Sequence, residues 1–408
     1  MRVLLSTYGS RGDVEPLVEL AVQLRALGAE VRMCAPPDED FVELLGRVGL
    51  PLVPIGRPMR TMVRPSSAAE ARDRVAEFAG QFDAVAEAAQ GCDVLLASGL
   101  AHFASRSVAE KLGIPYVYAT FCSFLLPTPH HAPPTALLPG GSLPAEVTDH
   151  RALWELNARL FDTMHGEALN AHRTSVGLPP VAGVRDFILT ERPWLASDPV
   201  LDPWQETADL GVVHTGAWIL PDERPLAPDL VAFLDAGTPP VFVGLGSTRH
   251  ASADIARVAI EAVRARGRRV LIGSGWSDLA RIDDQDDCFV VGEVNLQSLF
   301  ARVAAVIHHG GAGTTTTAAR AGAPQVVVPQ GADQPHWAGR VAALGIGAAA
   351  DGPAPTVDAL SAALGTALAP ETGARAQAVA ATIRTDGAAL AAKLLLEAAS
   401  DARPPASA

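Results

Sequence analysis

The sequence predicts an α/β protein with two Rossmann-like domains, each of them built on a parallel sheet. The chain has 408 residues, which is more than one compact hydrophobic core usually contains. Short apolar runs alternate with helical patterns along both halves, as expected for parallel strands that helices cover on both faces. This alternation restarts after a Pro-rich segment at 220–228. We therefore expect two sheets that face each other across a cleft, with ligands beyond the carboxyl ends of the strands.

The first half alternates predicted strands with predicted helices. Near-continuous apolar runs predict strands at 3–6, 30–35, 52–55, 93–97 and 115–119. Apolar residues with helical spacing predict helices at 16–27, 38–48 and 105–112. Two long stretches, 57–68 and 123–144, have no clear period and carry apolar and aromatic residues. They are either loops that contact a bulky, partly aromatic ligand or disordered loops.

The second half repeats this pattern. Strands are predicted at 240–244, 269–272, 288–291, 304–308 and 325–329. Helices are predicted at 253–264, 296–303 and 314–321, and a last helix at 388–399 closes the chain. We divide the chain into an N-terminal domain (1–215), an interdomain linker (216–235), a C-terminal domain (236–385) and a C-terminal helix and tail (386–408).

Composition excludes several classes of protein. The chain has 32 Lys and Arg against 45 Asp and Glu, and the net charge of −13 disfavours nucleic-acid binding, which depends on basic residues. No apolar stretch approaches the ~20 residues that a membrane-spanning helix needs. The first apolar run ends before Gly9 and Asp13, unlike a signal peptide. The four cysteines are scattered, which favours buried free thiols in a cytoplasmic protein.

The strongest local feature is the glycine-rich turn, residues 308–315 (HHGGAGTT), which follows a predicted strand and opens a helix. Its glycines let the backbone approach a ligand, and the N–H groups at the helix start favour an anion. Thr314 and Thr315 add hydroxyl donors, and His309 can donate a ring N–H or carry a positive charge. No Lys follows the glycines, so this is not a Walker loop. We predict a diphosphate site of mostly neutral donors; the alternative is a turn without a ligand.

A second motif, the polar loop at 329–335 (PQGADQP), also lies between a predicted strand and a predicted helix. Asp333 can accept hydrogen bonds from sugar hydroxyls, and Gln334 can donate to them. Asp333 can also cap the helix that is entered at Pro335. The two roles are compatible, so the loop predicts a sugar contact beside the diphosphate site.

Residues 9–16 (GSRGDVEP) connect the first strand to the first helix. They do not match GxGxxG, and the second strand ends without the acidic residue of a dinucleotide-binding fold, so hydride chemistry is weakly supported. The loop offers Asp13 near the mouth of the expected cleft, with Ser10 and Arg11 close by. Asp13 is either a catalytic carboxylate or only the N-cap of a helix that begins near Pro16.

Metal chemistry is not indicated. The Asp-x-Asp spacing at 283–287 (DDQDD) binds a divalent metal and a sugar diphosphate in some transferases, but a solvated loop is the favoured interpretation here. The 11 histidines form no zinc-ligand pattern. We expect neither a metal nor a cofactor.

Three segments together resemble the glycopeptide-antibiotic glycosyltransferases, which add sugars to vancomycin- and teicoplanin-type heptapeptides. These segments are 9–16, 215–225 (TGAWILPDERP) and the glycine-rich turn with the later Asp333-Gln334 pair. The resemblance covers essentially the whole chain. It implies a GT-B fold, with the acceptor in the N-terminal domain, the nucleotide sugar in the C-terminal domain and the C-terminal helix packed back on the N-terminal domain. It also implies an inverting reaction that needs no bound metal. We expect a monomer.

The resemblance also implies roles for individual residues. Asp13 would be the general base, with Ser10 and Arg11 near the donor phosphates. The other residues implied to bind the diphosphate are Ser247, His309, Gly311, Gly313 and Thr314. Those implied to bind the sugar are Asp333 and Gln334, and those implied to contact the nucleobase are Val294, Asn295 and Trp276. Met59, Met62, Phe124 and His130 lie in the loops implied to contact the acceptor.

One departure from the family concerns the nucleotide. Where several relatives read Ser-Arg-Gly-Trp, this chain has Gly273, Ser274, Gly275 and Trp276, so any nucleotide contact of that Arg is absent. The intact turn and Asp-Gln pair resemble members that use UDP-glucose or a close analogue. We expect UDP-glucose or UDP-N-acetylglucosamine as donor and a phenolic or benzylic hydroxyl of a heptapeptide aglycone as acceptor. The alternatives are a dTDP-aminosugar transferase of the same family, a GT-B-fold sugar-nucleotide epimerase, and a binding protein without turnover.

Overall fold

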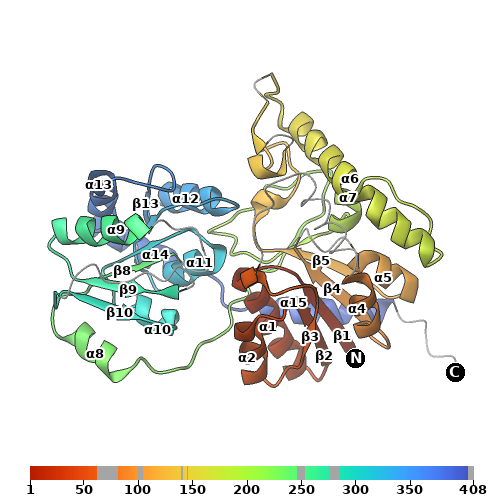
Figure 1. The fold of residues 1–408 in the computed structure, drawn as a ribbon, viewed down its shortest axis with the longest axis horizontal. Helices are drawn as coiled ribbons and strands as arrows, with labels where there is room; N and C mark the ends of the chain where they lie inside the picture. The colour runs from red at the N-terminus through yellow and green to blue at the C-terminus, as the bar shows by residue number, and fades with distance from the viewer. Residues whose placement is uncertain are drawn as a thin grey trace. The chain divides into compact units, whose positions relative to one another are not determined.

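The chain folds into two compact units (Figure 1). The computed structural model describes residues 1–61, 81–99, 104–138, 141–144, 146–245, 253–275 and 285–402. The first unit comprises 1–197, 204–220 and 385–408, and the second comprises 198–203 and 221–384. Each unit is built on a parallel sheet. The predicted architecture of two parallel-sheet domains is confirmed.

The sheet of the first unit has seven described strands in the order β3-β2-β1-β4-β5-β6-β7. Every neighbouring pair is parallel. The central strands are buried along almost their whole length, which explains their continuous apolar runs. The strands are β1 (Arg2–Thr7), β2 (Glu30–Ala35), β3 (Leu52–Pro54), β4 (Val94–Ser98), β5 (Tyr116–Thr120), β6 (Trp194–Leu195) and β7 (Val213–His214).

Helices connect these strands and cover the sheet (Figure 1). The α-helices of the first unit are α1 (Arg11–Ala26), α2 (Glu39–Arg47), α4 (Gln81–Ala88), α5 (Ser105–Leu112), α6 (His150–Ser175), α7 (Val184–Leu189) and α15 (Gly387–Asp401). Three short 3-10 helices lie in its described loops: η1 (Met59–Thr61), η2 (Ser123–Leu125) and η3 (Thr135–Leu137).

The sheet of the second unit has six described strands in the order β10-β9-β8-β11-β12-β13, all parallel. They are β8 (Val241–Gly244), β9 (Val270–Gly273), β10 (Cys288–Val291), β11 (Ala305–His308), β12 (Gln325–Val327) and β13 (Gly347–Ala349). The helices are α8 (Pro228–Asp235), α9 (Ala253–Ala265), α10 (Leu296–Phe300), α11 (Ala312–Arg320), α12 (Gln334–Ala343), α13 (Val357–Ala367) and α14 (Pro370–Ala380).

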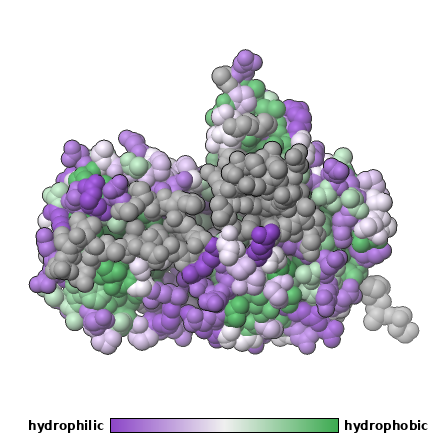
Figure 2. Space-filling view, viewed as in Figure 1, coloured by the Kyte–Doolittle hydropathy of each residue, from purple (hydrophilic) through white to green (hydrophobic). Residues whose placement is uncertain are grey.

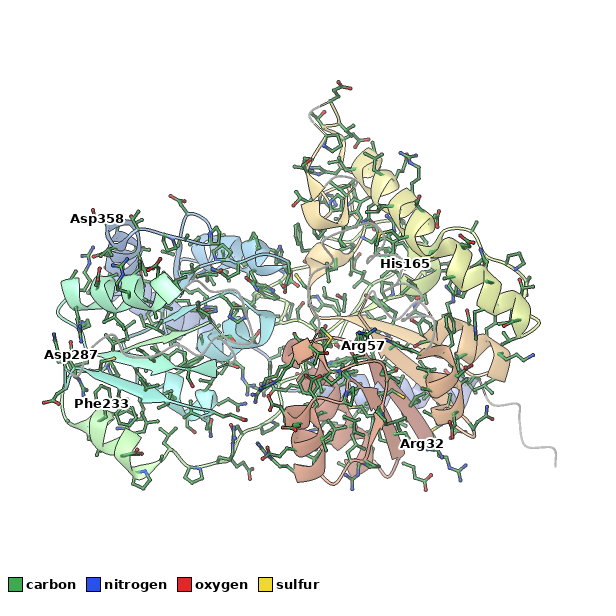
Figure 3. The ribbon with its side chains drawn as sticks, viewed as in Figure 1. Arg32, Arg57, His165, Phe233, Asp287 and Asp358 are labelled. Carbon is green, nitrogen blue, oxygen red and sulfur yellow. The ribbon has the colours of Figure 1, made fainter. Side chains whose placement is uncertain are left out.

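Helix α8 packs on a face of this second sheet through Leu230 and Leu234. The guanidinium of Arg269 lies 4.5 Å from the ring centroid of Phe233 on α8, which is labelled in Figure 3. The same side chain donates a hydrogen bond to the backbone oxygen of Thr238 at 2.6 Å. A cation over an aromatic face adds to the packing of α8.

Helix α1 begins at Arg11 and not at Pro16, so the predicted start was wrong. Ser10 is the N-cap, and the Asp13 carboxylate accepts a hydrogen bond from the Ser10 N–H at 2.8 Å. This capping interaction starts the helix before its apolar stripe begins. Pro16 then lies inside the helix. Because proline has no N–H, it donates no helical hydrogen bond to the carbonyl oxygen of Gly12, an exposed residue.

The described part of the 123–144 stretch is held on α6, which the sequence did not predict. Trp154 donates from Nε1 to the backbone oxygen of His131 at 2.9 Å, and Asn157 donates from Nδ2 to that of Leu137 at 2.7 Å. His150 Nδ1 lies 3.1 Å from the backbone oxygen of Pro129. These contacts hold the described part of the stretch on the helix, and its contact with a ligand stays a prediction.

The C-terminal helix α15 packs against α1 of the first unit, as expected. The contact at its start is tight because two glycines meet there. A Cβ on Gly387 would lie 2.5 Å from the backbone carbon of Gly216. Gly216 itself has a φ of 93°, a conformation that favours glycine. The last helix therefore belongs to the core of the first unit.

The surface hydropathy, the cysteines and the apolarity of the helices can be compared with what the composition predicts. Hydrophilic and hydrophobic residues are interspersed on the face shown in Figure 2. All four cysteines are buried free thiols, as predicted, and burial raises the pKa of Cys34 to about 12, which makes that thiol unreactive. Among the described helices, none is long and apolar enough to cross a membrane.

Candidate functional site

The glycine-rich turn joins β11 to α11 in the second unit. Gly310 has a φ of 92°, which glycine adopts without strain. A Cβ on Gly310 would lie 2.6 Å from Cγ1 of Val327 and 3.1 Å from the backbone oxygen of Gln334. The turn is therefore packed directly against β12 and the start of α12, which brings the two predicted donor motifs together.

The start of α11 offers backbone N–H groups to a ligand. Gly311 is the N-cap, and the first N–H groups of a helix have no acceptor inside the helix. Nothing lies within 4 Å of the position that a Cβ on Gly313 would take, so the approach from that side is open. Thr314 is half-buried, and its hydroxyl makes no hydrogen bond to a described residue.

The hydroxyl of the next residue, Thr315, is not available to a ligand. The Thr315 hydroxyl donates to the backbone oxygen of Gly311 at 2.9 Å, and its side chain is fully buried. The Thr316 hydroxyl makes the same bond to Ala312 at 2.8 Å. The prediction that Thr315 donates to a ligand was wrong, because such i to i−4 bonds satisfy the hydroxyl within the helix.

His309 lies against the turn. A Cβ on Gly311 would lie 2.6 Å from its Nε2, so glycine is required beneath the ring. Its Nδ1 is buried and has no partner among the described residues. Burial lowers the pKa of His309 to about 4, so the ring is neutral at pH 7 and the positive charge left open by the sequence is excluded there. A neutral ring still donates one N–H, and an unpartnered buried nitrogen fits a ligand contact.

The polar loop places Asp333 before α12 but not as a side-chain cap. Its Oδ2 accepts a hydrogen bond from the indole N–H of Trp337 at 2.8 Å, and it makes no side-chain bond to a backbone N–H of the helix. Burial raises the pKa of Asp333, and the Trp337 hydrogen bond opposes this rise. Asp333 is the N-cap residue of α12, as predicted, but its side chain makes no capping hydrogen bond. The indole instead fixes the orientation of the carboxylate.

Gln334 is oriented by the loop itself. Its Oε1 accepts hydrogen bonds from the N–H groups of Gln330 at 2.6 Å and Gly331 at 3.2 Å. Its amide NH₂ is therefore a donor, and no described residue accepts from it. Ala332, with a φ of 54°, adopts a left-handed backbone that costs roughly 1–2 kcal/mol for an L-residue. Strain of this kind is common where a loop holds functional groups.

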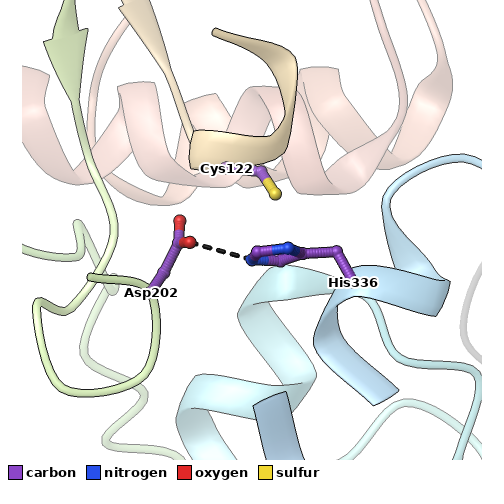
Figure 4. Close-up of side chains that lie close together, drawn as sticks. All are labelled: Cys122, Asp202 and His336. Atoms are coloured by element: carbon purple, nitrogen blue, oxygen red, sulfur yellow. Dashed lines mark hydrogen bonds and ion pairs between the residues drawn. The ribbon is translucent and has the colours of Figure 1, made fainter. Parts of the chain in front are cut away.

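Helix α12 is anchored to segment 198–203 of its own unit. His336 Nε2 lies 2.9 Å from Oδ1 of the buried Asp202, as Figure 4 shows. Arg340 donates from Nε to the backbone oxygen of Leu201 at 2.7 Å. These contacts fix α12, whose first turn includes the last two residues of the polar loop.

The segment predicted to contact a nucleobase lies at the start of α10. The Asn295 side chain caps this helix, because its Oδ1 accepts from the Ser298 N–H at 2.9 Å. Its Nδ2 donates to the backbone oxygens of Asp222 and Arg224 at 2.7 and 2.8 Å. The polar groups of the Asn295 side chain are thus hydrogen-bonded within the protein, so a ligand would contact the backbone of this residue. Val294 is half-buried and, with Asn295, lines a cavity of about 260 Å³.

In the first unit, Asp13 is the third residue of α1. Its Oδ2 accepts from the Ser10 N–H at 2.8 Å and from the Ser10 hydroxyl at 3.3 Å. A Cβ on Gly9 would lie 2.2 Å from the same oxygen, so Gly9 makes room for the carboxylate. The predicted N-cap role of Asp13 is wrong, because Ser10 takes that position. Arg11 pairs with Glu15 at 2.7 Å.

The predicted acceptor residues differ in their surroundings. Phe124 is half-buried on η2, with its ring centroid 5.4 Å from that of His131. His130 is exposed. Met59 is held through its N–H, which donates to Asp38 Oδ2 at 2.6 Å, and its side chain packs against the core. Met59 is therefore in part a core residue.

Some predicted residues lie outside the described part of the chain. These are Met62, Ser247 and Trp276, together with Asp283 and Asp284 of the acidic run. At the end of that run, Asp287 (labelled in Figure 3) accepts two hydrogen bonds from Arg264, at 2.7 and 2.8 Å. This ion pair favours a structural role for Asp287 over metal binding.

Sequence reasoning missed three supporting residues: His308, Gln325 and Trp337. His308 and Gln325 are buried polar side chains at the ends of apolar strands, and the ring of one pairs with the amide of the other at 2.8 Å. A polar residue in an apolar strand was a usable signal, because a buried polar group needs a partner. Trp337 lies four residues after Asp333, a spacing that places two side chains on one helix face.

Two family models match the chain. The Glycosyltransferase family 28 N-terminal domain matches residues 3–127, and the Erythromycin biosynthesis protein CIII-like, C-terminal domain matches residues 274–392. The glycosyltransferase GtfE of Amycolatopsis orientalis is 58% identical over 99% of both chains. The vancomycin aglycone glucosyltransferase of the same organism is 57% identical over 100% of both chains.

Two further similarities bear on the donor and on the fold. A dTDP-epi-vancosaminyltransferase of Amycolatopsis orientalis is 52% identical over 93% of both chains. The solved structure of the glycotransferase of kitacinnamycin superposes with a TM-score of 0.73 at 21% identity, covering 97% of this chain and 98% of the other. This last similarity concerns the fold alone.

Proposed function

Because the chain belongs to the glycosyltransferases of vancomycin-type glycopeptide antibiotics, we propose that it moves glucose or N-acetylglucosamine from a UDP-sugar to a heptapeptide aglycone. Family membership makes it a glycosyltransferase that acts on an antibiotic aglycone. Beyond family membership, we propose four further properties: a UDP-hexose donor, a phenolic or benzylic acceptor hydroxyl, inversion at the anomeric carbon and independence from metal.

The observation that carries the donor side is the glycine-rich turn packed against the start of α12. A leaving diphosphate gains negative charge as the sugar departs. Preorganised neutral donors stabilise such charge without reorganising, and removing one donor of this kind typically costs about 3–4 kcal/mol. The free N–H groups at the α11 start, Thr314 and the neutral His309 ring supply these donors. Asp333 and Gln334 supply an acceptor and a donor for sugar hydroxyls.

The proposed reaction is a single in-line displacement. Asp13 takes the proton from the acceptor hydroxyl while that oxygen bonds to the anomeric carbon. The bond between the anomeric carbon and the diphosphate oxygen breaks, and UDP leaves with the electron pair. Attack from the opposite side inverts the anomeric carbon. A phenol, with a reference pKa near 10, loses its proton more readily than an alcohol, which suits the carboxylate.

The test is a matrix of donors and acceptors. UDP-glucose, UDP-N-acetylglucosamine, dTDP-glucose and a dTDP-aminosugar are each incubated with vancomycin-type and teicoplanin-type aglycones. We expect a monoglycosylated product of inverted configuration with a UDP-hexose, at the same rate with and without EDTA. Loss of turnover in EDTA that added Mg²⁺ restores would contradict metal independence. An isomerised UDP-sugar formed without any aglycone would instead identify an epimerase.

A second candidate function is transfer of a dTDP-aminosugar. The similarity to the dTDP-epi-vancosaminyltransferase, 52% identical over 93% of both chains, favours it over an epimerase or a binding protein without turnover. In the same matrix, turnover with the dTDP-aminosugar and none with either UDP-hexose would select this function and refute the UDP donor.

A further inference from the structure

We propose that Gln325 and His308 are positioning residues that hold the glycine-rich turn through the N–H of Gly310. For the identity of the ligand, the inference rests on the proposed function. The hydrogen-bonded arrangement does not depend on it. Neither side chain belongs to the residues that we assign to the donor, and both have 0% exposure.

The parallel register brings the two side chains together. Val306 of β11 lies opposite Gln325 of β12, and His308 lies opposite Val327. Since alternate residues of a strand share one face, His308 and Gln325 project from the same face of the sheet. Helix α11 follows β11 directly, and its Thr315 reaches this pair through its backbone oxygen. Buried polar groups in such an apolar setting are expected to pair.

The direction of each hydrogen bond is determined. The backbone oxygen of Thr315 only accepts, so the group that faces it at 3.3 Å is the Gln325 amide NH₂. The Gln325 Oε1 then faces His308 Nε2 at 2.8 Å, which must carry the ring proton. His308 Nδ1 keeps its lone pair and accepts from the Gly310 N–H at 3.1 Å. These three hydrogen bonds form a relay from the Gly310 N–H through His308 and Gln325 to the Thr315 oxygen. The relay selects the Nε2–H tautomer of His308.

The relay closes on the turn itself. Thr315, at one end, donates from its N–H and its hydroxyl to the backbone oxygen of Gly311, at 3.0 and 2.9 Å. Gly310, at the other end, is the residue before Gly311. Two successive residues of the turn are thus held, one by its N–H and one by its carbonyl. His309 lies between His308 and Gly310, so its ring is carried by a segment fixed on both sides.

The arrangement is insensitive to pH over the ordinary working range. Burial lowers the pKa of His308 to about 3, so the ring remains neutral and keeps a lone pair at Nδ1. Fixing donors in advance of the reaction is the general way in which a site stabilises developing charge. Losing the relay should therefore weaken donor binding more than acceptor binding.

The first variant is Gln325→Met, which keeps the length of the side chain and removes the acceptor for Nε2–H. The His308 ring can then place its proton on Nδ1, where it opposes the Gly310 N–H. We expect the dissociation constant of UDP to rise about tenfold, with the KM of the aglycone unchanged, because a buried donor loses its partner. Long-range ¹H–¹⁵N spectra of protein labelled at histidine should show Nε2–H in the wild type and an Nδ1–H fraction in the variant.

A second pair of variants separates positioning from packing. His308→Asn keeps an acceptor oxygen near the position of Nδ1, whereas His308→Leu keeps volume without an acceptor. We expect His308→Asn to bind UDP more tightly than His308→Leu, and its spectrum assigns the His308 signals. The matched control is Gln377→Met, which removes a bond of 3.2 Å to the backbone oxygen of Gly322, just beyond the other end of α11. It should lower the Tm and leave UDP affinity and the tautomer unchanged.

Three results would overturn the proposal: an Nδ1–H tautomer in the wild type, unchanged UDP affinity in Gln325→Met, or equal affinities of the two His308 variants. Loss of UDP affinity in Gln377→Met would assign the effect to general loss of stability and also overturn it. If the wild type binds neither UDP nor dTDP, the proposed donor is refuted. The tautomer spectra of the wild type and Gln325→Met then decide the relay independently.

Discussion

Asp13 combines a helix contact with the chemistry that we propose for it. Its Oδ2 accepts from the Ser10 N–H at 2.8 Å, so the carboxylate is oriented by the first turn of α1. Gly9 leaves the space that this orientation needs, since a Cβ there would overlap the carboxylate. The sequence offered a choice between a cap and a catalytic group. The structure excludes the N-cap position, which Ser10 takes. The contact with the Ser10 N–H nevertheless holds the carboxylate in one orientation, as a catalytic group needs.

The variant Asp13→Asn tests the base assignment. Its amide oxygen can still accept from the Ser10 N–H, but it cannot take a proton. We expect kcat to fall roughly 10²–10⁴-fold, the usual contribution of a general base, with little change in the dissociation constant of UDP. Steady-state kinetics and titration calorimetry measure the two quantities.

Two further variants control this test. Ser10→Ala removes the 3.3 Å hydroxyl contact and the capping-box contact of the Ser10 side chain with the Asp13 N–H. The Ser10 N–H still holds the carboxylate, so this variant should keep most of the turnover. Asp13→Ala removes both the base and the helix contact, so it should lose turnover and also lower the Tm. Near-normal turnover of Asp13→Asn would refute the assignment of the base.

The local structure around single residues was predicted well where it depends on neighbours in the sequence and poorly where it depends on a distant partner. The glycine-rich turn was visible because glycines after a strand and before a helix are a local pattern. The error at Thr315 arose because its hydroxyl bonds to Gly311 within the helix. The charge of His309 depends on burial, which a sequence does not display. His308 and Gln325 pair only through the register of two strands.

At the scale of elements, the hydrophobic periodicity located helices with one buried face and strands that are buried on both faces. The bounds of β10 and α5 agree with the prediction. The start of α1 was missed because a capping interaction, and not the apolar stripe, begins that helix. Helix α6 was missed because its 26 residues follow a loop without a period and carry many polar side chains. It packs on α7 and on that loop as well as on the core, so its apolar residues are spread over several contacts.

The buried histidines between β11 and α11, His308 and His309, predict that folding is sensitive to acid. Burial lowers the pKa of His308 to about 3 and that of His309 to about 4, from 6.5. Below pH 6.5 the unfolded chain binds protons at these rings and the folded chain does not, so stability is lost as the pH falls. For the fully buried His308 the loss is about 1.4 kcal/mol per pH unit.

Urea unfolding at pH 7.5, 6 and 5 checks this expectation. The free energy of unfolding of the wild type should fall more steeply toward pH 5 than that of His308→Asn, which does not titrate. The contributions of groups that do not interact with His308 cancel in this comparison. Parallel curves for the two proteins would contradict the prediction.

The start of α15 gives a second prediction at this scale. Gly387→Ala places a Cβ 2.5 Å from the backbone of Gly216, and overpacking of this kind costs about 1–3 kcal/mol. Thermal unfolding should show a lower Tm. The matched control is Gly373→Ala in α14, where nothing lies within 4 Å of the new Cβ. Since alanine favours a helix over glycine, that variant should be neutral or slightly stabilised. An equal loss in both variants would contradict the packing argument.

At the scale of the whole molecule, the chain passes between its units several times. Segment 198–203 belongs to the second unit, while 204–220 and 385–408 belong to the first. Periodicity does not reveal the placement of 198–203, because the segment has no helix or strand. It is held instead by side chains: Arg340 binds the backbone oxygen of Leu201, and Asp198 accepts from the Arg384 N–H at 2.9 Å.

The net charge of −13 repels a nucleoside diphosphate, and the site that we propose meets this repulsion with neutral donors. Salt screens charges that lie far apart, with a Debye length that falls from about 30 Å at 0.01 M to about 10 Å at 0.1 M. Hydrogen bonds from backbone N–H groups and a neutral His309 do not weaken in this way. The dissociation constant of UDP should therefore stay constant or fall as NaCl rises from about 0.01 to 0.3 M.

Titration calorimetry across this salt range measures the effect, and Arg11→Gln removes the cation that the resemblance implies near the donor phosphates. Because the Arg11 guanidinium pairs with Glu15 at 2.7 Å, we expect this variant to leave the salt dependence of UDP binding unchanged. A site built on cations behaves in the opposite way, because added salt screens its attraction for the diphosphate. If the dissociation constant rose about tenfold over this range, the donor site would be cationic, and the role that we give to the neutral donors of the glycine-rich turn would be wrong.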